Sequence, residues 1–417
     1  MLPRRIPVRY LSILLLIGLL SAACSGAPAP TLVFNTAVPA TATPPGGGQA
    51  PSQTVAPAAT DTTAPAASDT PAPPAADTAT SAPAAPTRTS PPPTAQQPAD
   101  TITPIPAAPA SGGSGVSADY LDDRSTATGL IQSYFNAINL KQYLRAYSYW
   151  EKGSKVGPYG PFQQGYQDTA SVQVTLGTIS GDAGAGQRYF TVPAALVAKT
   201  TNGKTQTFAA CYTLHLGSPD IQGVPPFNPL AIATGVAKVA TNGTSAKNLL
   251  VHACDGLPQG SPIVPAPVTN PKDITSGNYL DDRSNAVDVL SSLFNAVNRK
   301  EYVRAYSYWE TNSKVGPFDK FQQGYAATAS VQLTTGKVTT GNGAGQIYYT
   351  VPAVLKAKTS GGVTQTFSAC YILHLSRPEI QGTPPFQPLA IQSATAKQVS
   401  NGSDTDTLLA KACAGQP

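Results

Sequence analysis

The sequence predicts an α+β protein that contains two copies of one domain. The segment Tyr120–Cys254 aligns without a gap with Tyr279–Cys413, 159 residues further along the chain, and 81 of the 135 aligned positions are identical. Within each copy, helical periodicity comes first and strand-like alternation follows, an order typical of α+β domains. A repeat of this length forms a complete domain, in contrast to the short units of a solenoid.

The first 24 residues, MLPRRIPVRYLSILLLIGLLSAAC, have the pattern of a secretory signal peptide. Three arginines precede an apolar run, Leu11–Leu20, that is too short to span a bilayer as a mature helix. The end resembles the lipobox of bacterial lipoproteins, although Ser21 stands where leucine is favoured. We therefore expect a signal peptide over 1–23 and a lipid on Cys24. The alternative is ordinary cleavage near Ala23, which would release a free secreted protein.

The segment 24–116 is dominated by Ala, Pro, Thr and Ser and holds one aromatic residue, Phe34. Such a composition cannot bury enough apolar surface to offset the entropy of ordering, so we expect a disordered stalk. At roughly 3 Å per residue it could extend on the order of 250 Å, enough to cross a cell-wall layer. A second Pro-rich stretch, 256–274, reads as a linker between domains at 117–255 and 275–417.

The charge balance excludes some partners. The formal charge of +5 falls to +2 once the three arginines of the signal peptide are removed. A nearly neutral chain has no electrostatic footprint for nucleic acid or for an anionic membrane surface, so we expect no nucleic-acid binding. The Gly-rich segments GDAGAG and GNGAG lack the full dinucleotide fingerprint, and no G-x-S-x-G, S-x-x-K or H-E-x-x-H motif occurs. The sequence therefore predicts no cofactor and no catalytic residue.

Helices are expected at the start of each domain. In the first, a helix with a start signal at Ser117 or Asp119 is indicated by apolar residues at helical spacing, namely Leu130, Ile131, Tyr134, Phe135 and Ile138. A second helix is expected over Tyr143–Trp150, ending at GSKVGP, and a short third one around Phe162–Tyr166. The alternating runs that follow predict strands: SVQVTLGTI, RYFTVPAALVAK, TFAACYTLHL and LAIATGVAKVA.

This element order, with the N-x-x-x-Y-x-x-A-Y-x-x-W helix that ends at Trp150 and the FQQGY segment before the sheet, resembles the nuclear-transport-factor-two-like superfamily, also called SnoaL-like or ketosteroid-isomerase-like. The resemblance covers each repeat nearly whole. It implies a cone-like domain in which a curved antiparallel sheet wraps around the N-terminal helices and leaves a pocket. Some members are isomerases, cyclases or dehydratases, and many are non-catalytic. Members often dimerise face to face, so the two domains are expected to be able to pair with each other.

Beyond Cys24, each domain carries two cysteines 43 residues apart: Cys211 and Cys254, then Cys370 and Cys413. In an exported protein, matching pairs in duplicated domains indicate one disulfide per domain. Each bond would contribute about 4 kcal/mol by closing a loop of that size. The alternative, a thiolate metal site, needs a shared ligand set, which is incomplete because His252 in the first copy becomes Lys411 in the second. We therefore expect no metal.

Three sets of polar residues recur in both copies. Asp122, Asp123 and Arg124 (then Asp281, Asp282 and Arg283) fall in the expected first helical turn, where capping is favoured over proton transfer. His215 and His374 share a strand face with the first cysteine of each pair, and we interpret them as partly exposed, hydrogen-bonded residues, with a general-base role as the alternative. Glu151 and Glu310 are expected to face solvent or form salt bridges.

Aromatic residues at helical spacing could line a pocket for a flat or sugar-like ligand, or could simply be core. The candidates are Tyr134, Tyr147, Trp150, Tyr166, Tyr189, Tyr306, Trp309, Tyr325 and Tyr348. The sequence thus favours an extracytoplasmic lipoprotein, held at the bacterial membrane by its lipid. Its tandem non-catalytic domains would bind a repeated partner, such as a wall polymer or an envelope protein, through a raised effective concentration. An isomerase-like enzyme or carrier that uses the pockets, and a structural spacer, remain the alternatives.

Overall fold

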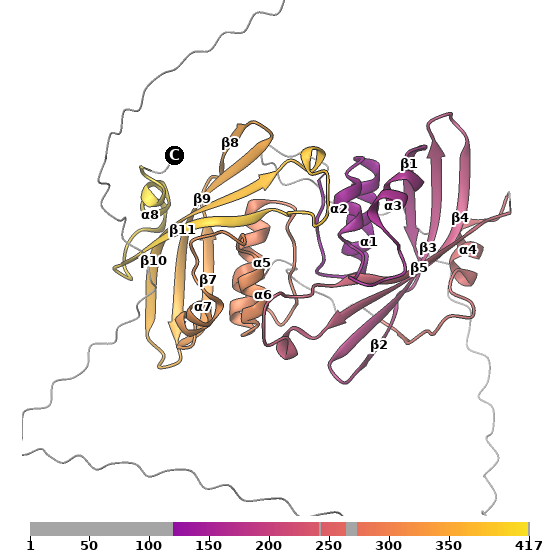
Figure 1. Ribbon diagram of the computed structural model, residues 1–417. Helices are drawn as coiled ribbons and strands as arrows, with labels where there is room; N and C mark the ends of the chain where they lie inside the picture. Colours follow the sequence, from indigo (N-terminus) through magenta and orange to yellow (C-terminus); the bar gives the residue numbers. More distant parts are fainter. Residues whose placement is uncertain (1–119, 242, 264–272, 416–417) are drawn as a thin grey trace, which may run out of the picture. The chain divides into compact units, whose positions relative to one another are not determined.

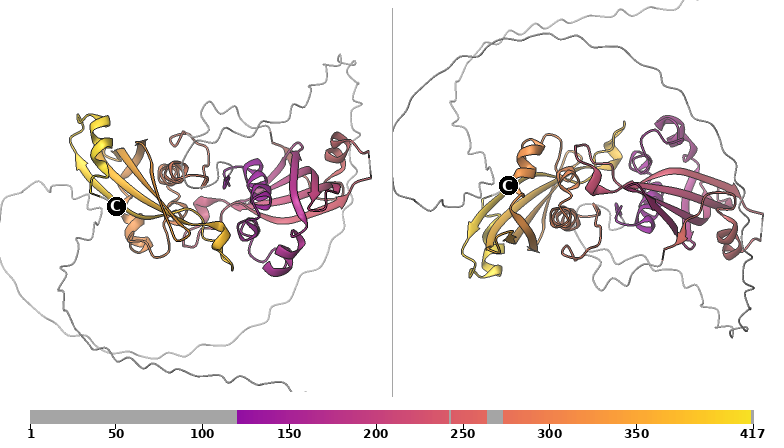
Figure 2. Two further views of the ribbon diagram at one scale, coloured as in Figure 1. Left: turned by 90° about the horizontal axis from the view of Figure 1, so that it is seen from above. Right: turned by 90° about the horizontal axis from the view of Figure 1, so that it is seen from below.

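The computed structural model describes residues 120–241, 243–263 and 273–415 (Figure 1). The expected signal peptide, Cys24, the expected stalk, the start signals Ser117 and Asp119, and residues 264–272 of the expected linker lie outside this part of the chain. The described chain mixes helices with two antiparallel sheets, as expected for the α+β class. The two sheets are separate in both views of Figure 2.

Three helices open each repeat, and each helix of the first repeat has a counterpart in the second. They are α1 (Ala127–Asn139), α2 (Tyr143–Tyr147) and α3 (Tyr159–Gly165), then α5 (Ala286–Asn298), α6 (Tyr302–Ser307) and α7 (Phe318–Gly324). The five apolar residues that predicted α1 are all buried in the core of the first repeat. Helix α2 ends at Tyr147, earlier than expected, because Trp150 already pairs as a β-bridge with Ile232.

The first sheet contains β1 (Thr169–Leu176), β2 (Ser180–Gly184), β3 (Gln187–Thr200), β4 (Thr205–Gly217), β5 (Ala231–Val239) and β6 (Ser261–Pro262). Strand β3 pairs with β4 along one edge, and β5 pairs with β4 beyond it. The other edge of β3 is shared, since β2 pairs with its beginning and β1 with its end. In this register Tyr189 lies opposite His215, which positions the candidate site described below.

The second sheet repeats the pairing with β7 (Thr328–Thr335), β8 (Thr339–Gly343), β9 (Gln346–Thr359), β10 (Thr364–Ser376) and β11 (Ala390–Val399). Here Tyr348 lies opposite His374. A short 3₁₀ helix follows the long central hairpin in each repeat, at Pro219–Ile221 and Pro378–Ile380.

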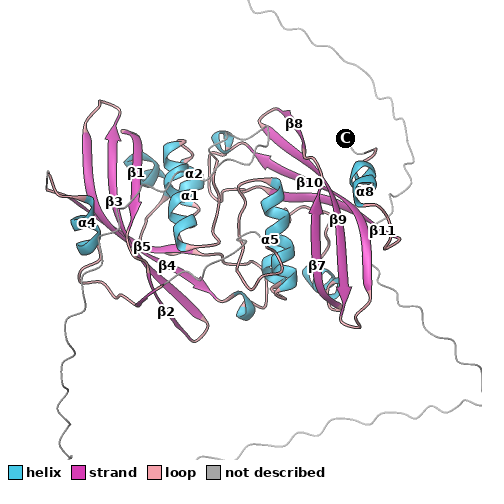
Figure 3. Ribbon diagram, turned by 180° about the vertical axis from the view of Figure 1, so that it is seen from behind, coloured by secondary structure: helices cyan, strands magenta, loops and turns pink. Residues whose placement is uncertain are grey.

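Each sheet carries helices on both faces. Figures 1 and 3 show α5 and the C-terminal helix α8 (Thr405–Ala412) on opposite sides of the second sheet. In the first repeat, α4 (Ala246–His252) occupies the place of α8, and disulfides join Cys211 to Cys254 and Cys370 to Cys413. These are the pairs expected from their spacing. Disulfides are typical of proteins that fold in an oxidising, extracytoplasmic compartment.

Alternation along β4 separates two faces as expected, because Tyr212, Leu214 and Leu216 are buried in the core that faces α1. One boundary differs from expectation, because Ser261–Pro262, inside the expected linker, pairs with β2 as β6. Within the described ranges, no helix combines the length and apolar character needed to cross a membrane.

Candidate functional site

A carboxylate, an imidazole and an amide form a hydrogen-bonded cluster on the face of the first sheet opposite α1. His215, near the end of β4, has Nδ1 2.7 Å from Oε1 of Glu151 and Nε2 2.7 Å from Oε1 of Gln187. Glu151 reaches this point because its backbone N–H donates to the carbonyl of Ile232, which anchors the segment after α2 to β5. Gln187 is the first residue of β3, the strand beside His215. Both ring nitrogens therefore have protein partners.

The second repeat builds the same cluster from equivalent residues. His374 Nδ1 lies 2.5 Å from Oε1 of Glu310, and Nε2 lies 2.6 Å from Oε1 of Gln346. The hydroxyl of Ser376 donates to the same Gln346 oxygen at 2.7 Å. The first repeat has Gly217 at the position of Ser376. This hydroxyl contact is therefore the one difference between the polar contacts described for the two clusters.

A tyrosine ring lies flat against each imidazole. The ring centroids of Tyr189 and His215 are 4.7 Å apart with 17° between the planes, and Tyr348 stacks on His374 at 4.7 Å and 21°. Both tyrosines remain open to solvent, at 45% and 37% exposure, although the histidine side chains beneath are only 20% and 18% exposed. We call each set of four, Glu151–Gln187–Tyr189–His215 and Glu310–Gln346–Tyr348–His374, a Tyr–His cluster.

A groove of about 350 Å³ borders the Tyr–His cluster of the first repeat. Glu151 and His215 belong to both the cluster and the groove, and Arg124, Ser148 and Asn228 add polar groups to the lining. The guanidinium of Arg124 is fixed by hydrogen bonds from Nη2 to the carbonyl oxygen and hydroxyl of Ser148. The groove therefore presents the positioned guanidinium of Arg124 near the carboxylate and imidazole of the cluster.

The other aromatic residues considered for a pocket pack within the two repeats. Tyr134 and Tyr166 share a hydrogen bond of 2.6 Å between their hydroxyls, and Tyr134 is 1% exposed. Tyr147 and its counterpart Tyr306 pack on α3 and α7 and donate to backbone carbonyls. Tyr325 and Trp309 pack against the core of the second repeat, whereas Trp150 packs on the first core and also lines the groove. Tyr189 and Tyr348 are instead exposed to solvent, in the Tyr–His clusters.

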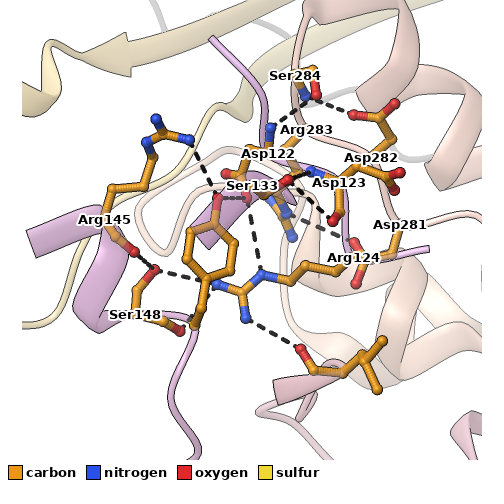
Figure 4. Close-up of polar contacts among 12 residues, drawn as sticks. Asp122, Asp123, Arg124, Ser133, Arg145, Ser148, Asp281, Asp282, Arg283 and Ser284 are labelled. Carbon is orange, nitrogen blue, oxygen red and sulfur yellow. Dashed lines mark hydrogen bonds and ion pairs between the residues drawn. The ribbon is translucent and has the colours of Figure 1, made fainter. Parts of the chain in front are cut away.

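The repeated Asp-Asp-Arg-Ser segments form a contact between the two repeats (Figure 4). Asp123 and Asp282 form an antiparallel β-bridge, and the backbone N–H groups of Asp122 and Asp281 donate to hydroxyls across it, those of Ser284 and Ser125, at 2.9 and 2.8 Å. The expectation that these aspartates cap the first helix is wrong. Thr126 caps α1 by accepting from the N–H of Gly129, and Asn285 caps α5, because the helices begin after the contact segments.

Burial at this contact alters the acidity of two carboxyl groups. Desolvation raises the pKa of Asp123, and the charges of Asp281 and Asp122 add to the effect, which hydrogen bonds from Ser125 oppose. Burial and then the charges of Asp123 and Asp288 raise the pKa of Asp282 to about 8. A cavity of about 310 Å³ lies beside the two aspartates. Among the described residues, no group of three or more His, Cys, Asp or Glu side chains is arranged to hold a metal ion.

Each contact segment rests on a fully buried arginine. Arg145 Nη2 donates to Oδ1 of Asn136 at 2.7 Å, Nη1 donates to the carbonyl of Leu121, and the guanidinium lies over the ring of Tyr120. Arg304 makes the equivalent contacts in the second repeat and adds an ion pair with Glu301, where the first repeat has Gln142.

Reasoning from the sequence did not predict the Tyr–His cluster, because its members come from three separate segments whose alignment depends on strand register. The two copies do contain a signal for it. Glu, Gln, Tyr and His recur at all four positions, whereas the neighbours Lys152 and Arg188 become Thr311 and Ile347.

Searches with this sequence found no match among protein-family models, curated proteins or solved structures.

Proposed function

We propose that this chain is an exported lipoprotein, attached through Cys24, that presents two non-catalytic binding sites outside the cytoplasm. The Tyr–His cluster, present in both repeats, carries the proposal. A general base needs a ring nitrogen that substrate can reach. Both nitrogens of His215 and of His374 are already paired with protein groups, whereas the stacked tyrosine is exposed. This arrangement suits recognition better than proton transfer.

Two further observations support the proposal. The hydroxyls of Tyr134 and Tyr166, two residues considered for a pocket, bond to each other in the first repeat, which favours surface binding over the enzyme or carrier alternative. The two disulfides fit an extracytoplasmic location, and the leader with Cys24 supplies the attachment. We also propose that each repeat is a cone-like domain of the nuclear-transport-factor-two-like type. The N-terminal helix packed against an antiparallel sheet, with two short strands sharing one edge of β3, supports that assignment.

Two sites on one chain predict avidity for a repetitive partner. When the second binding event becomes intramolecular, overall affinity can rise about 10²–10⁴-fold. We expect His215→Ala or His374→Ala alone to weaken binding of the purified chain to isolated cell envelopes at least about tenfold, and the double variant to reduce binding to background. The substitution His252→Ala, in an exposed histidine of the first repeat, is the matched control. If the double variant binds envelopes as the unmodified chain does, the proposed function is wrong.

The attachment is tested separately. A Cys24→Ala chain, expressed with its leader, is expected to lose incorporation of radiolabelled palmitate and to leave the membrane fraction. If the variant stays with the membrane fraction, lipid attachment at Cys24 is wrong.

A further inference from the structure

The exposed tyrosine of each Tyr–His cluster stacks on an imidazole that is itself hydrogen-bonded on both ring nitrogens. The imidazole covers one face of the ring, and that imidazole is fixed from two directions, by Glu151 and Gln187 in the first repeat. Among the described residues, the hydroxyls of Tyr189 and Tyr348 have no hydrogen-bond partner, so the polar network does not serve the tyrosine hydroxyl. It orients the ring plane.

A ring fixed in this way presents its free face as a flat, preorganised platform. Preorganisation lowers the entropy that a binding site loses when a ligand arrives, so it increases affinity without any added contact. Tyrosine suits this role because it offers a large contact area with few rotatable bonds. The same platform occurs in both repeats, although residues beside it differ.

The surroundings of the platform indicate the chemistry of the ligand. A ligand that fits must combine a flat apolar face with hydroxyl or amide groups around its edge. The groove that Glu151 and His215 also line supplies the carboxylate of Glu151, the guanidinium of Arg124 and the amide of Asn228, groups of the kind that pair with hydroxyls and amides. A pyranose ring has this shape, because its axial C–H groups form an apolar face and its hydroxyls point outward.

We propose that Tyr189 and Tyr348 are stacking platforms for the pyranose rings of a cell-envelope polysaccharide, whose hydroxyls bond, in the first repeat, to polar groups of the groove that borders the cluster. This inference rests on the proposed function and specifies its ligand. A protein partner fits less well, since protein interfaces bury their aromatic anchors in an apolar, desolvated centre. The members of the first cluster that line the groove, Glu151 and His215, are instead charged or polar.

The test uses the full mature chain with Cys24→Ala for solubility and two glycan probes. One probe is purified peptidoglycan sacculi stripped of attached polymers, assayed by co-sedimentation. The other is the polysaccharide fraction released from the same walls, assayed by affinity electrophoresis. Binding to one probe and not the other identifies the source of the sugar.

Four variants separate stacking from general damage. We expect Tyr189→Ala to weaken binding at least about tenfold through lost avidity, and Tyr189→Ala with Tyr348→Ala to abolish it. The corresponding Phe pair keeps the ring and is expected to bind within about twofold of the unmodified chain. As a control, Val251→Ala with Val363→Ala removes one exposed apolar side chain from each repeat outside the groove and should leave binding unchanged.

A second measurement uses the unmodified chain, so its result does not depend on whether the variants fold. N-acetylimidazole should acetylate the exposed hydroxyls of Tyr189 and Tyr348, and the bound glycan should slow that reaction at both sites, as read by mass spectrometry. The proposal is overturned if the Ala pair binds like the unmodified chain, if the glycan leaves both acetylation rates unchanged, or if neither probe binds. If neither probe binds but the Ala pair abolishes binding to whole envelopes, the ligand class is wrong and the proposed function stands. If binding to envelopes is absent too, both fail.

Discussion

The backbone N–H of Arg124 lies 2.7 Å from the carbonyl oxygen of Asp281, and the N–H of Arg283 lies 2.7 Å from the carbonyl oxygen of Asp122. The two bonds are equivalent, because each repeat donates one of them and accepts the other. The same residues of both repeats meet in a self-complementary arrangement, the kind of contact that identical subunits make around a two-fold axis. Because the side chain of Arg124 also lines the groove, the segment links the contact between the repeats to the first Tyr–His cluster.

Removing the hydroxyls at this contact should destabilise the folded chain. In Ser125→Ala with Ser284→Ala, the backbone N–H groups of Asp281 and Asp122 lose their acceptors. An unsatisfied buried donor costs about 1–3 kcal/mol, so we expect a comparable loss in the free energy of unfolding for each site, measured by urea denaturation. Ser360→Ala, at an exposed serine, is the control and should change stability by less than about 0.5 kcal/mol. Equal effects of the two variants would contradict the assigned role.

The aspartates at the contact are expected to stabilise the folded chain more at acidic pH than at alkaline pH. Asp282 has a folded-state pKa of about 8, above its ordinary value of 3.8, so the folded chain keeps a proton that the unfolded chain has already lost. The contribution of this group to stability is therefore complete below about pH 4 and is lost as pH rises through about 8. Asp123, whose pKa is also raised, acts in the same direction.

The substitution Asp282→Asn isolates this effect, because the amide keeps the shape and cannot ionise. We expect the difference in unfolding free energy between the variant and the unmodified chain to shift in favour of the variant between pH 5 and pH 9, by urea denaturation at each pH. Asp319→Asn, at an exposed position of α7, should show no such trend. A difference for Asp282→Asn that is constant with pH would refute the assigned titration.

Periodicity and alternation were sufficient to predict much of the fold. The core face of α1 followed from the spacing of residues such as Leu130 and Phe135, and the burial of Tyr212 and Leu214 followed from alternation in β4. Such patterns report local geometry, which each segment carries in its own sequence. The exact start of α1 was not predicted. Asp122, Asp123 and Thr126 are all suitable residues for the start of a helix. The helix begins after Thr126 because Asp122 and Asp123 take part in the contact between the repeats.

The candidate site was harder to predict, because it depends on contacts between segments that are distant in sequence. Glu151 and His215 are 64 residues apart, and they meet because Trp150 pairs with Ile232 while β4 pairs with β5. No local pattern carries that information. Comparison of the two repeats was the one available signal, since all four residues of the cluster are retained.

The disulfides are expected to contribute several kcal/mol of stability. Cys211–Cys254 ties β4 to the segment after α4 and closes a loop of 43 residues, for which the chain-entropy model gives about 4 kcal/mol. We expect Cys211→Ala with Cys254→Ala to lower the free energy of unfolding by about 2–4 kcal/mol in urea. Dithiothreitol should then affect that variant only through Cys370–Cys413. A variant as stable as the unmodified chain would show that the bond is not a stabilising constraint.

Gln142 is a neutral residue between two charges, and making it acidic should be unfavourable. It is 5% exposed, its Oε1 accepts from Nε of Arg145 at 2.7 Å, and its Nε2 donates to Oε1 of Glu379 at 2.7 Å. In Gln142→Glu a carboxylate replaces that donor and faces the carboxylate of Glu379. We expect the variant to lose about 1–2 kcal/mol of unfolding free energy. The equivalent Glu301 of the second repeat avoids this cost because it pairs with Arg299 and Arg304.

A double-mutant cycle with Glu379→Gln isolates the repulsion. Once Glu379 is neutral, the new carboxylate keeps the attraction of Arg145 and no longer faces a like charge. Gln142→Glu should therefore cost less in that background, with a coupling energy of about 1 kcal/mol or more between the two positions. The cycle is read from urea unfolding of all four chains at pH 7. A coupling energy near zero would mean that Gln142 and Glu379 do not meet in solution, and the contact between the repeats would then have to be assigned to the Asp-Asp-Arg-Ser segments alone.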